Sequence, residues 1–181
     1  NRYPLPDIET LTKGNRKIGL GVMGFADLLI MLKIPYDSTE ALTMGARVMR
    51  FVWEQGRAAS ADLARERGEF PNWNGSRLQA ERHRLRNATV TTVAPPGTIS
   101  IIADCSPGIE PLYGVSFMRN VLEDVRLVTL HPLFVEMARA AGIYSERLAR
   151  RVASQVSIRD IREIPEDLRR LWDRFRPEGE V

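Results

Sequence analysis

The chain has 181 residues, of which 44% are hydrophobic and 27% charged, and a formal net charge of +3 at pH 7, which is the composition of an ordinary globular domain with a real core. Its one cysteine excludes an intrachain disulfide framework and favours a reducing, cytoplasmic setting, while the longest apolar stretch, from Ile18 to Leu32, contains Asp27 and three glycines and predicts no membrane span. Only 7% of the residues are aromatic and acidic residues break up most of the arginine clusters, so we expect solvated helix faces and no nucleic-acid partner.

The first part of the chain has a helical pattern. It opens without methionine on a Tyr3–Pro6 segment that is typical of a connection inside a longer protein, which predicts a fragment. From Asp7 to Lys33, apolar residues then recur three and four positions apart, and this spacing predicts a helix that ends at Pro35. A second helix is expected from Asp37, which would cap it together with Glu40, to a stop at Gly68.

The second half begins with a short arginine-rich helix and then a strand. Five β-branched residues in a row, Thr89–Val93, predict a short buried strand. After a Gly/Pro-rich passage we expect an extended Val115–Met118. The remainder is expected to be helical, with a start near His131–Pro132, a break at Gly142 and a last helix opened by Pro165. No repeat or boundary divides the chain, which predicts one partial domain over residues 1–181.

The most informative segment is the turn that follows the β-branched strand, Ala94–Ser100. A strand that stops at Pro-Pro-Gly and passes into a helix start leaves backbone N–H groups pointing into one space, with no side-chain bulk at Gly97. This arrangement is typical of an anion site. A simple structural turn is the alternative, because proline and glycine mark turns of every kind.

A second glycine motif, Gly19–Gly24, matches the GxGxxG pattern of dinucleotide-binding folds. That fingerprint requires a strand directly before it, and the polar sequence of Thr12–Lys17 is not typical of a buried strand. We therefore expect the glycines inside a helix, where they let another backbone approach closely.

Several blocks in order resemble the catalytic subunit of ribonucleotide reductases. The matching blocks are Arg16–Leu29, Ile34–Ser38, Glu66–Pro71, Arg86–Thr89, Ser106–Pro111 and Ile164–Leu168. They cover about residues 1 to 172. The sequence of Ala103–Ser106, followed by Gly108–Pro111, is most similar to that of the adenosylcobalamin-dependent (class II) branch.

The resemblance implies an α/β fold, a helix-rich part of the C-terminal half of a ten-stranded α/β barrel. It also implies that the turn binds the phosphates of a ribonucleoside di- or triphosphate through amides and a hydroxyl. The residues placed there are Ala94, Pro95, Pro96, Gly97, Thr98, Ile99 and Ser100, the first and last flanking the contact. Pro96 stands where the family usually has threonine, so a hydroxyl and an N–H donor are missing at that position.

The resemblance places the reaction's radical cysteine, its redox cysteine pair and the neighbouring Asn and Glu outside this segment. Cys105 matches none of them and is interpreted as a packed thiol, and Glu110 either serves as an acid or fixes its loop. No catalytic residue and no metal site are expected here, since His83 and His131 have no ligand spacing around them. Adenosylcobalamin, a thiol reductant system and the remainder of the reductase chain are the implied cofactor and partners.

Two alternatives remain open from the sequence. A class I large subunit would take its radical from a partner protein instead of cobalamin. A split or degenerate piece would act only as a binding module that complements another chain.

Overall fold

The computed structural model describes residues 2–112, 114–122, 125–155 and 157–173, with the backbone alone over 117–128. It divides into two compact units. Unit 1 consists of Asn1–Val22 and Gly45–Pro95, and unit 2 of Met23–Met44 and Pro96–Val181. Whether the two units make up one domain, as the sequence predicts, stays a prediction.

The prediction of one long helix from Asp7 to Lys33 is wrong in the middle of that range, where the chain is not helical. Helix α1, Pro6–Asn15, ends where Arg16 adopts a left-handed conformation with φ of 47°. Residues 16–24 are not helical, and α2 then covers Phe25–Met31. The apolar spacing continued across the break, but three glycines at 19, 21 and 24 lower the helical propensity there, and backbone pairing holds the segment extended.

That pairing joins two segments of unit 1. The amide of Ile18 donates to the Thr89 carbonyl (3.1 Å), Leu20 N–H donates to Val90 O (2.9 Å), and Thr92 N–H donates to Leu20 O (3.1 Å). Leu20 and Thr91 thereby form a parallel bridge. The short buried strand predicted for Thr89–Val93 is wrong in extent, because the run forms only this one-residue bridge and Val90 is its one buried residue. The glycines of the motif are not inside a helix, which corrects that expectation.

Helix α3, Thr39–Arg67, has 29 residues and is therefore about 43 Å long. In its first turn the Ser38 Oγ accepts the amide of Ala41 at 3.1 Å, which places this cap one residue after the predicted Asp37. It ends at Gly68 as predicted, with φ of +76°, a conformation that suits glycine.

Unit 1 is completed by two short helices, η1 (Pro71–Trp73) and α4 (Arg77–Ala80), and by polar contacts. Arg86 directs one guanidinium nitrogen to the carbonyls of residues 67, 68 and 69 at the end of α3. The buried Asn87 donates from Nδ2 to Arg16 O (2.9 Å) and accepts from Ser60 Oγ (2.9 Å).

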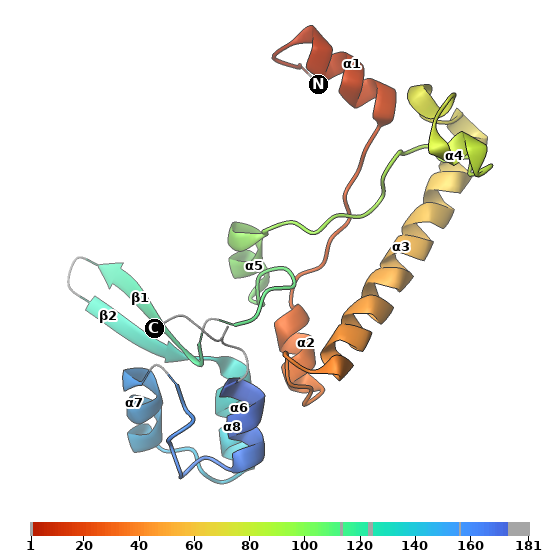
Figure 1. Cartoon of the computed structure of the whole chain (residues 1–181). Coiled ribbons are helices and arrows are strands. Elements are labelled where there is room, and N and C mark those ends of the chain that lie inside the picture. Colours follow the sequence, from red (N-terminus) through yellow and green to blue (C-terminus); the bar gives the residue numbers. More distant parts are fainter. Residues whose placement is uncertain (1, 113, 123–124, 156, 174–181) are drawn as a thin grey trace. The chain divides into compact units, whose positions relative to one another are not determined.

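Unit 2 contains α2, the start of α3, a hairpin and the later helices (Figure 1). Its further elements are α5 (Gly97–Ala103), β1 (Ser116–Leu122), β2 (Val125–Leu130), α6 (Pro132–Ala140), α7 (Glu146–Ser154) and α8 (Glu166–Asp173). The strands pair antiparallel, from Ser116 opposite Leu130 to Leu122 opposite Val125. Strand β1 extends the predicted Val115–Met118 segment, whereas β2 corrects the expectation that only helix follows it.

The main hydrophobic core lies in unit 2. Its largest fully buried side chains are Leu29 and Ile30 of α2, Phe134 of α6, Leu148 of α7 and Ile161 before α8. The predicted start at His131, the break at Gly142 and the helix after Pro165 are confirmed.

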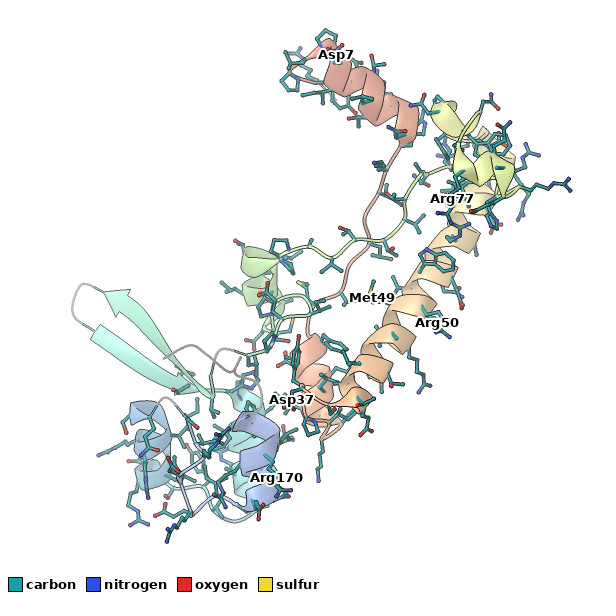
Figure 2. All side chains as sticks on the ribbon, in the orientation of Figure 1. Asp7, Asp37, Met49, Arg50, Arg77 and Arg170 are labelled. Carbon is teal, nitrogen blue, oxygen red and sulfur yellow. The ribbon has the colours of Figure 1, made fainter. Side chains whose placement is uncertain are left out.

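The arginines sit mostly on exposed helix faces. Arg77 on α4 and Arg170 on α8 are labelled in Figure 2. Each pairs with a glutamate four positions away at 2.5 Å, Glu81 and Glu166 respectively. Such exposed pairs contribute little to stability, as expected for solvated helix faces.

Candidate functional site

The Ala94–Ser100 turn leads from the extended segment into helix α5. Ala94 and Pro95 are exposed and end unit 1, and Pro96 is the N-cap residue of α5 with φ of −86° and ψ of 56°. Ser100 is buried, donates its amide to Pro96 O (3.0 Å) and donates its hydroxyl to Gly97 O (2.7 Å). Ser100 therefore fixes the first turn from inside and is turned away from solvent.

The first turn of α5 offers amide donors. Ser100 makes the first main-chain bond of the helix, so the amides of Gly97, Thr98 and Ile99 precede it and have no partner within the helix. No side chain caps this end, and all three residues are exposed. A Cβ built on Gly97 would meet no atom within 4 Å, so the backbone here is open to an approaching group.

The loop after α5 is held against the N-terminus of α2 by a reciprocal pair of hydrogen bonds. Ser106 N–H donates to Asp27 Oδ2 (2.6 Å), and Asp27 N–H donates to Ser106 Oγ (3.3 Å). The Gly24 amide donates to Ser106 O (2.8 Å) and the Phe25 amide to Gly108 O (3.3 Å). This is the hydrogen-bond pattern of a capping box, with the cap residue 79 positions downstream.

These contacts exclude a dinucleotide site at the glycine motif. A pyrophosphate would need the first amides of α2, and the chain itself occupies three of them, those of Gly24, Phe25 and Asp27. The structure thus supports the rejection of the dinucleotide reading.

The second oxygen of Asp27 faces a histidine. His131 Nε2 lies 3.2 Å from Asp27 Oδ1, and the His131 ring packs on Trp172 with centroids 5.2 Å apart. Burial raises the pKa of the Asp27 carboxyl, but the hydrogen bonds from His131 and Ser106 outweigh it and hold the pKa below its usual value. Sequence reasoning noted Asp27 only as an interruption of an apolar stretch, and a lone carboxylate there was the signal for this role.

Cys105 and Glu110 belong to the segment that follows α5. Cys105 is a free thiol of intermediate burial, and its pKa is raised by burial and by the charges of Asp27 and Asp104, which keeps it protonated. Glu110 donates its amide to Pro107 O (3.1 Å), and Tyr36 donates its hydroxyl to Ile109 O (2.7 Å). This bond involves only the backbone of Glu110, so the role of its carboxylate, as an acid or as a group that fixes the loop, stays a prediction.

Within the described ranges, no cluster of three or more His, Cys, Asp or Glu side chains could hold a metal ion. None of the described helices is long and apolar enough to cross a membrane. His131 is turned to Asp27 and Trp172.

A family model described as the ribonucleotide reductase barrel domain matches residues 1–84 and 77–176. The chain belongs to the ribonucleotide reductase family. It is 48% identical over 172 residues to the vitamin B12-dependent ribonucleoside-diphosphate reductase of Thermoplasma acidophilum, covering 95% of this chain and 22% of that protein. The enzyme of the same description from Mycobacterium tuberculosis is 42% identical over 93% of this chain and 24% of its own length.

Other reductases are more distant. Large chain 2 of the ribonucleoside-diphosphate reductase of Saccharomyces cerevisiae is 24% identical, over 95% of this chain and 23% of that protein. Among solved structures, the Actinobacillus ureae class Id ribonucleotide reductase alpha subunit aligns with a TM-score of 0.75 at 20% identity, over 93% of this chain and 30% of that one. The fold is therefore a helix-rich α/β part of the reductase barrel, and the chain spans about a quarter of the curated relatives.

Proposed function

We propose that the chain is part of a cobalamin-dependent reductase that converts ribonucleoside diphosphates to deoxyribonucleotides for DNA replication in the cytoplasm. The observation that carries this proposal is the 48% and 42% identity to two B12-dependent diphosphate reductases, against 24% to the yeast large chain. When bound, adenosylcobalamin would supply the radical. The remainder of the reductase chain and a thiol reductant system would be its partners.

Within this function, we propose that residues Ala94–Ser100 bind the phosphates of the substrate. The support is local: the amides of Gly97, Thr98 and Ile99 open the first turn of α5, and the exposed Thr98 adds a hydroxyl. No lysine or arginine lies between Asn87 and Arg119 in the sequence, so backbone donors and the helix end carry the attraction. Ser100, whose hydroxyl bonds Gly97 O, acts by holding the turn.

The test uses a chimera in which this chain replaces the matching segment of the Thermoplasma acidophilum reductase. Gly97→Val places its Cβ where no atom of the chain lies within 4 Å, and should block the approach of a phosphate. We expect the Kd and KM for a ribonucleoside diphosphate to rise sharply. Gly114→Ala is the control for a glycine replacement, because an added Cβ there would make only ordinary van der Waals contact with Ser116, at 3.6 Å.

Pro96→Thr is the complementary variant, since it restores an amide donor and a hydroxyl. It should tighten binding by about 1 kcal/mol, the contribution of one hydrogen bond to a charged group. If Gly97→Val leaves nucleotide affinity unchanged, the segment is only a structural turn.

We further propose that the chain by itself has no reductase activity, because its single cysteine cannot form the dithiol that supplies two electrons. Deoxyribonucleotide formation by the isolated chain with adenosylcobalamin and a thiol reductant would contradict this.

A further inference from the structure

We propose that Asp27 is a positioning residue for the nucleotide-binding turn, acting on the first turn of α5 through the loop that follows it. This inference rests on the proposed function of the Ala94–Ser100 turn. It assigns a role to a carboxylate that lies on a different helix, α2, and that touches no part of the turn in the contacts described above.

A continuous series of hydrogen bonds connects the two places, all within unit 2. Asp27 Oδ2 accepts the amide of Ser106 (2.6 Å), and the preceding amide, that of Cys105, donates to Ser100 O (3.1 Å). Ser100 in turn donates its hydroxyl to Gly97 O (2.7 Å). Two neighbouring peptide groups therefore hold α5 on one side and α2 on the other.

Little else in the described contacts fixes α5 from its sides. Ile99, Ile101 and Ile102 are 54%, 74% and 81% exposed, so the helix buries little apolar surface in this chain. The buried Ser100 and the bonds of its neighbours at 105 and 106 are the anchor. The orientation of the first-turn amides thus depends on where Asp27 holds residue 106.

Asp27 is itself fixed from both sides, as a positioning residue must be. Its backbone lies in the first turn of α2, whose Ala26, Leu29 and Ile30 are fully buried in the core of unit 2. Its second oxygen lies 3.2 Å from His131 Nε2 at the start of α6. The carboxylate connects the core to the loop.

The experiment uses the reductase chimera described above and two readouts. The Kd for a ribonucleoside diphosphate is measured without cobalamin, and KM and kcat are measured with it. Asp27→Ala removes the acceptor of the Ser106 amide and should raise Kd and KM about tenfold, the scale of one charge-assisted hydrogen bond. The kcat at saturating substrate should fall by a smaller factor, because Asp27 does not contact the reacting atoms.

Two further variants separate positioning from general destabilisation. Asp27→Asn keeps the shape and one acceptor oxygen, and should raise Kd less than Asp27→Ala. Ser106→Ala loses the Oγ contact but keeps the amide that Asp27 accepts, so it should lower the melting temperature with a smaller change in Kd. Glu40→Gln, an exposed carboxylate at the start of α3, is the matched control and should leave Kd unchanged.

The outcomes distinguish this inference from the function on which it rests. If Gly97→Val raises Kd while Asp27→Ala and Asp27→Asn bind as tightly as the parent chimera, the positioning role is wrong and the phosphate turn stands. If Asp27→Ala does not fold, Asp27→Asn decides by the same criterion. If the parent chimera binds no ribonucleoside diphosphate, the proposed function fails and the positioning role with it.

Discussion

The two units are stabilised by different means. In unit 2, α2, α6, α7 and the residues before α8 bury a continuous set of aliphatic and aromatic side chains, including Phe134 and Ile161 with no exposed surface. In unit 1 the buried set is smaller, and polar contacts join its segments, such as Asn87 with Ser60 and Arg16. Several of its large apolar side chains, Ile18, Leu20, Phe51 and Val93 among them, are at least half exposed.

This difference shows where specificity and stability reside. A close-packed apolar core loses buried area and leaves a cavity when a side chain is shortened, whereas a hydrogen-bonded contact depends on direction and is costly when one partner is lost. We therefore expect volume changes to dominate in unit 2 and loss of single polar partners to dominate in unit 1.

The largest effect is expected in the unit 2 core. Phe134→Ala leaves a cavity beside Trp172, whose ring lies edge-on at 5.6 Å, and should lower the free energy of unfolding by about 3–5 kcal/mol. Urea denaturation of the chain measures it. Leu42→Ala, at a residue 74% exposed, is the control and should change stability by less than about 0.5 kcal/mol. Equal losses for both variants would show that unit 2 is not held by its core.

In unit 1, Asn87→Ala should lower the free energy of unfolding by about 2–3 kcal/mol. It removes two side-chain hydrogen bonds and leaves the buried Ser60 hydroxyl and the Arg16 carbonyl without this partner. Amide hydrogen exchange at Leu20 and Thr92 should rise with it, because Arg16 precedes the paired segment. Asn74→Ala, at an exposed asparagine, provides the comparison. If Asn87→Ala loses no more unfolding free energy than Asn74→Ala, polar contacts do not stabilise unit 1.

The glycine-containing segment of unit 1 should resist added volume. A Cβ on Gly21 would lie 3.0 Å from the backbone oxygen of Thr92, so Gly21→Val should destabilise by roughly 1–3 kcal/mol through overpacking. Gly97→Val, where no atom lies within 4 Å of the added Cβ, is the matched control for thermal denaturation. A Gly21→Val chain that kept its melting temperature but lost measurable NAD affinity would restore the dinucleotide interpretation.

The smallest effect concerns pH and unit 2. Because the pKa of Asp27 is lowered in the folded chain, its ionised form adds stability above its unfolded value of about 4, and this is lost as the pH falls through the lower folded pKa. Unfolding free energies measured from pH 6 downwards should decline less steeply for Asp27→Asn than for the parent chain. Asp62→Asn, at an exposed carboxylate, should leave that slope unchanged. Identical slopes in all three chains would show that Asp27 does not contribute to the loss of stability at low pH.

Sequence reasoning found the features that are encoded locally. Gly68, Gly142 and Pro165 mark the ends or starts of helices through their own backbone preferences, so these positions were predictable without knowledge of distant contacts. The helix start after Pro-Pro-Gly was predictable for the same reason, because that sequence is a local signal, while phosphate binding by the turn stays a prediction.

What could not be predicted depends on distant partners. The helical spacing through Ile18–Phe25 was overridden by pairing with a segment about 70 residues away, which no local window contains. The cap of α2 comes from Ser106, and the orientation of Asp27 depends on His131. Strand β2 was missed because nothing before His131 marked a second strand, and only its pairing with β1 defines it.

The distance in sequence between the two members of the capping pair has a consequence for synthesis. Ser106 follows Asp27 by 79 positions, so at about 5–20 residues per second the ribosome needs roughly 4–16 s to supply it. During that interval the seven-residue α2 has neither its cap nor its core partners from α6, and so short a helix is marginal in isolation. The order of emergence makes the nascent Met23–Met44 segment a late-folding element whose structure is completed only when the second half of the chain arrives.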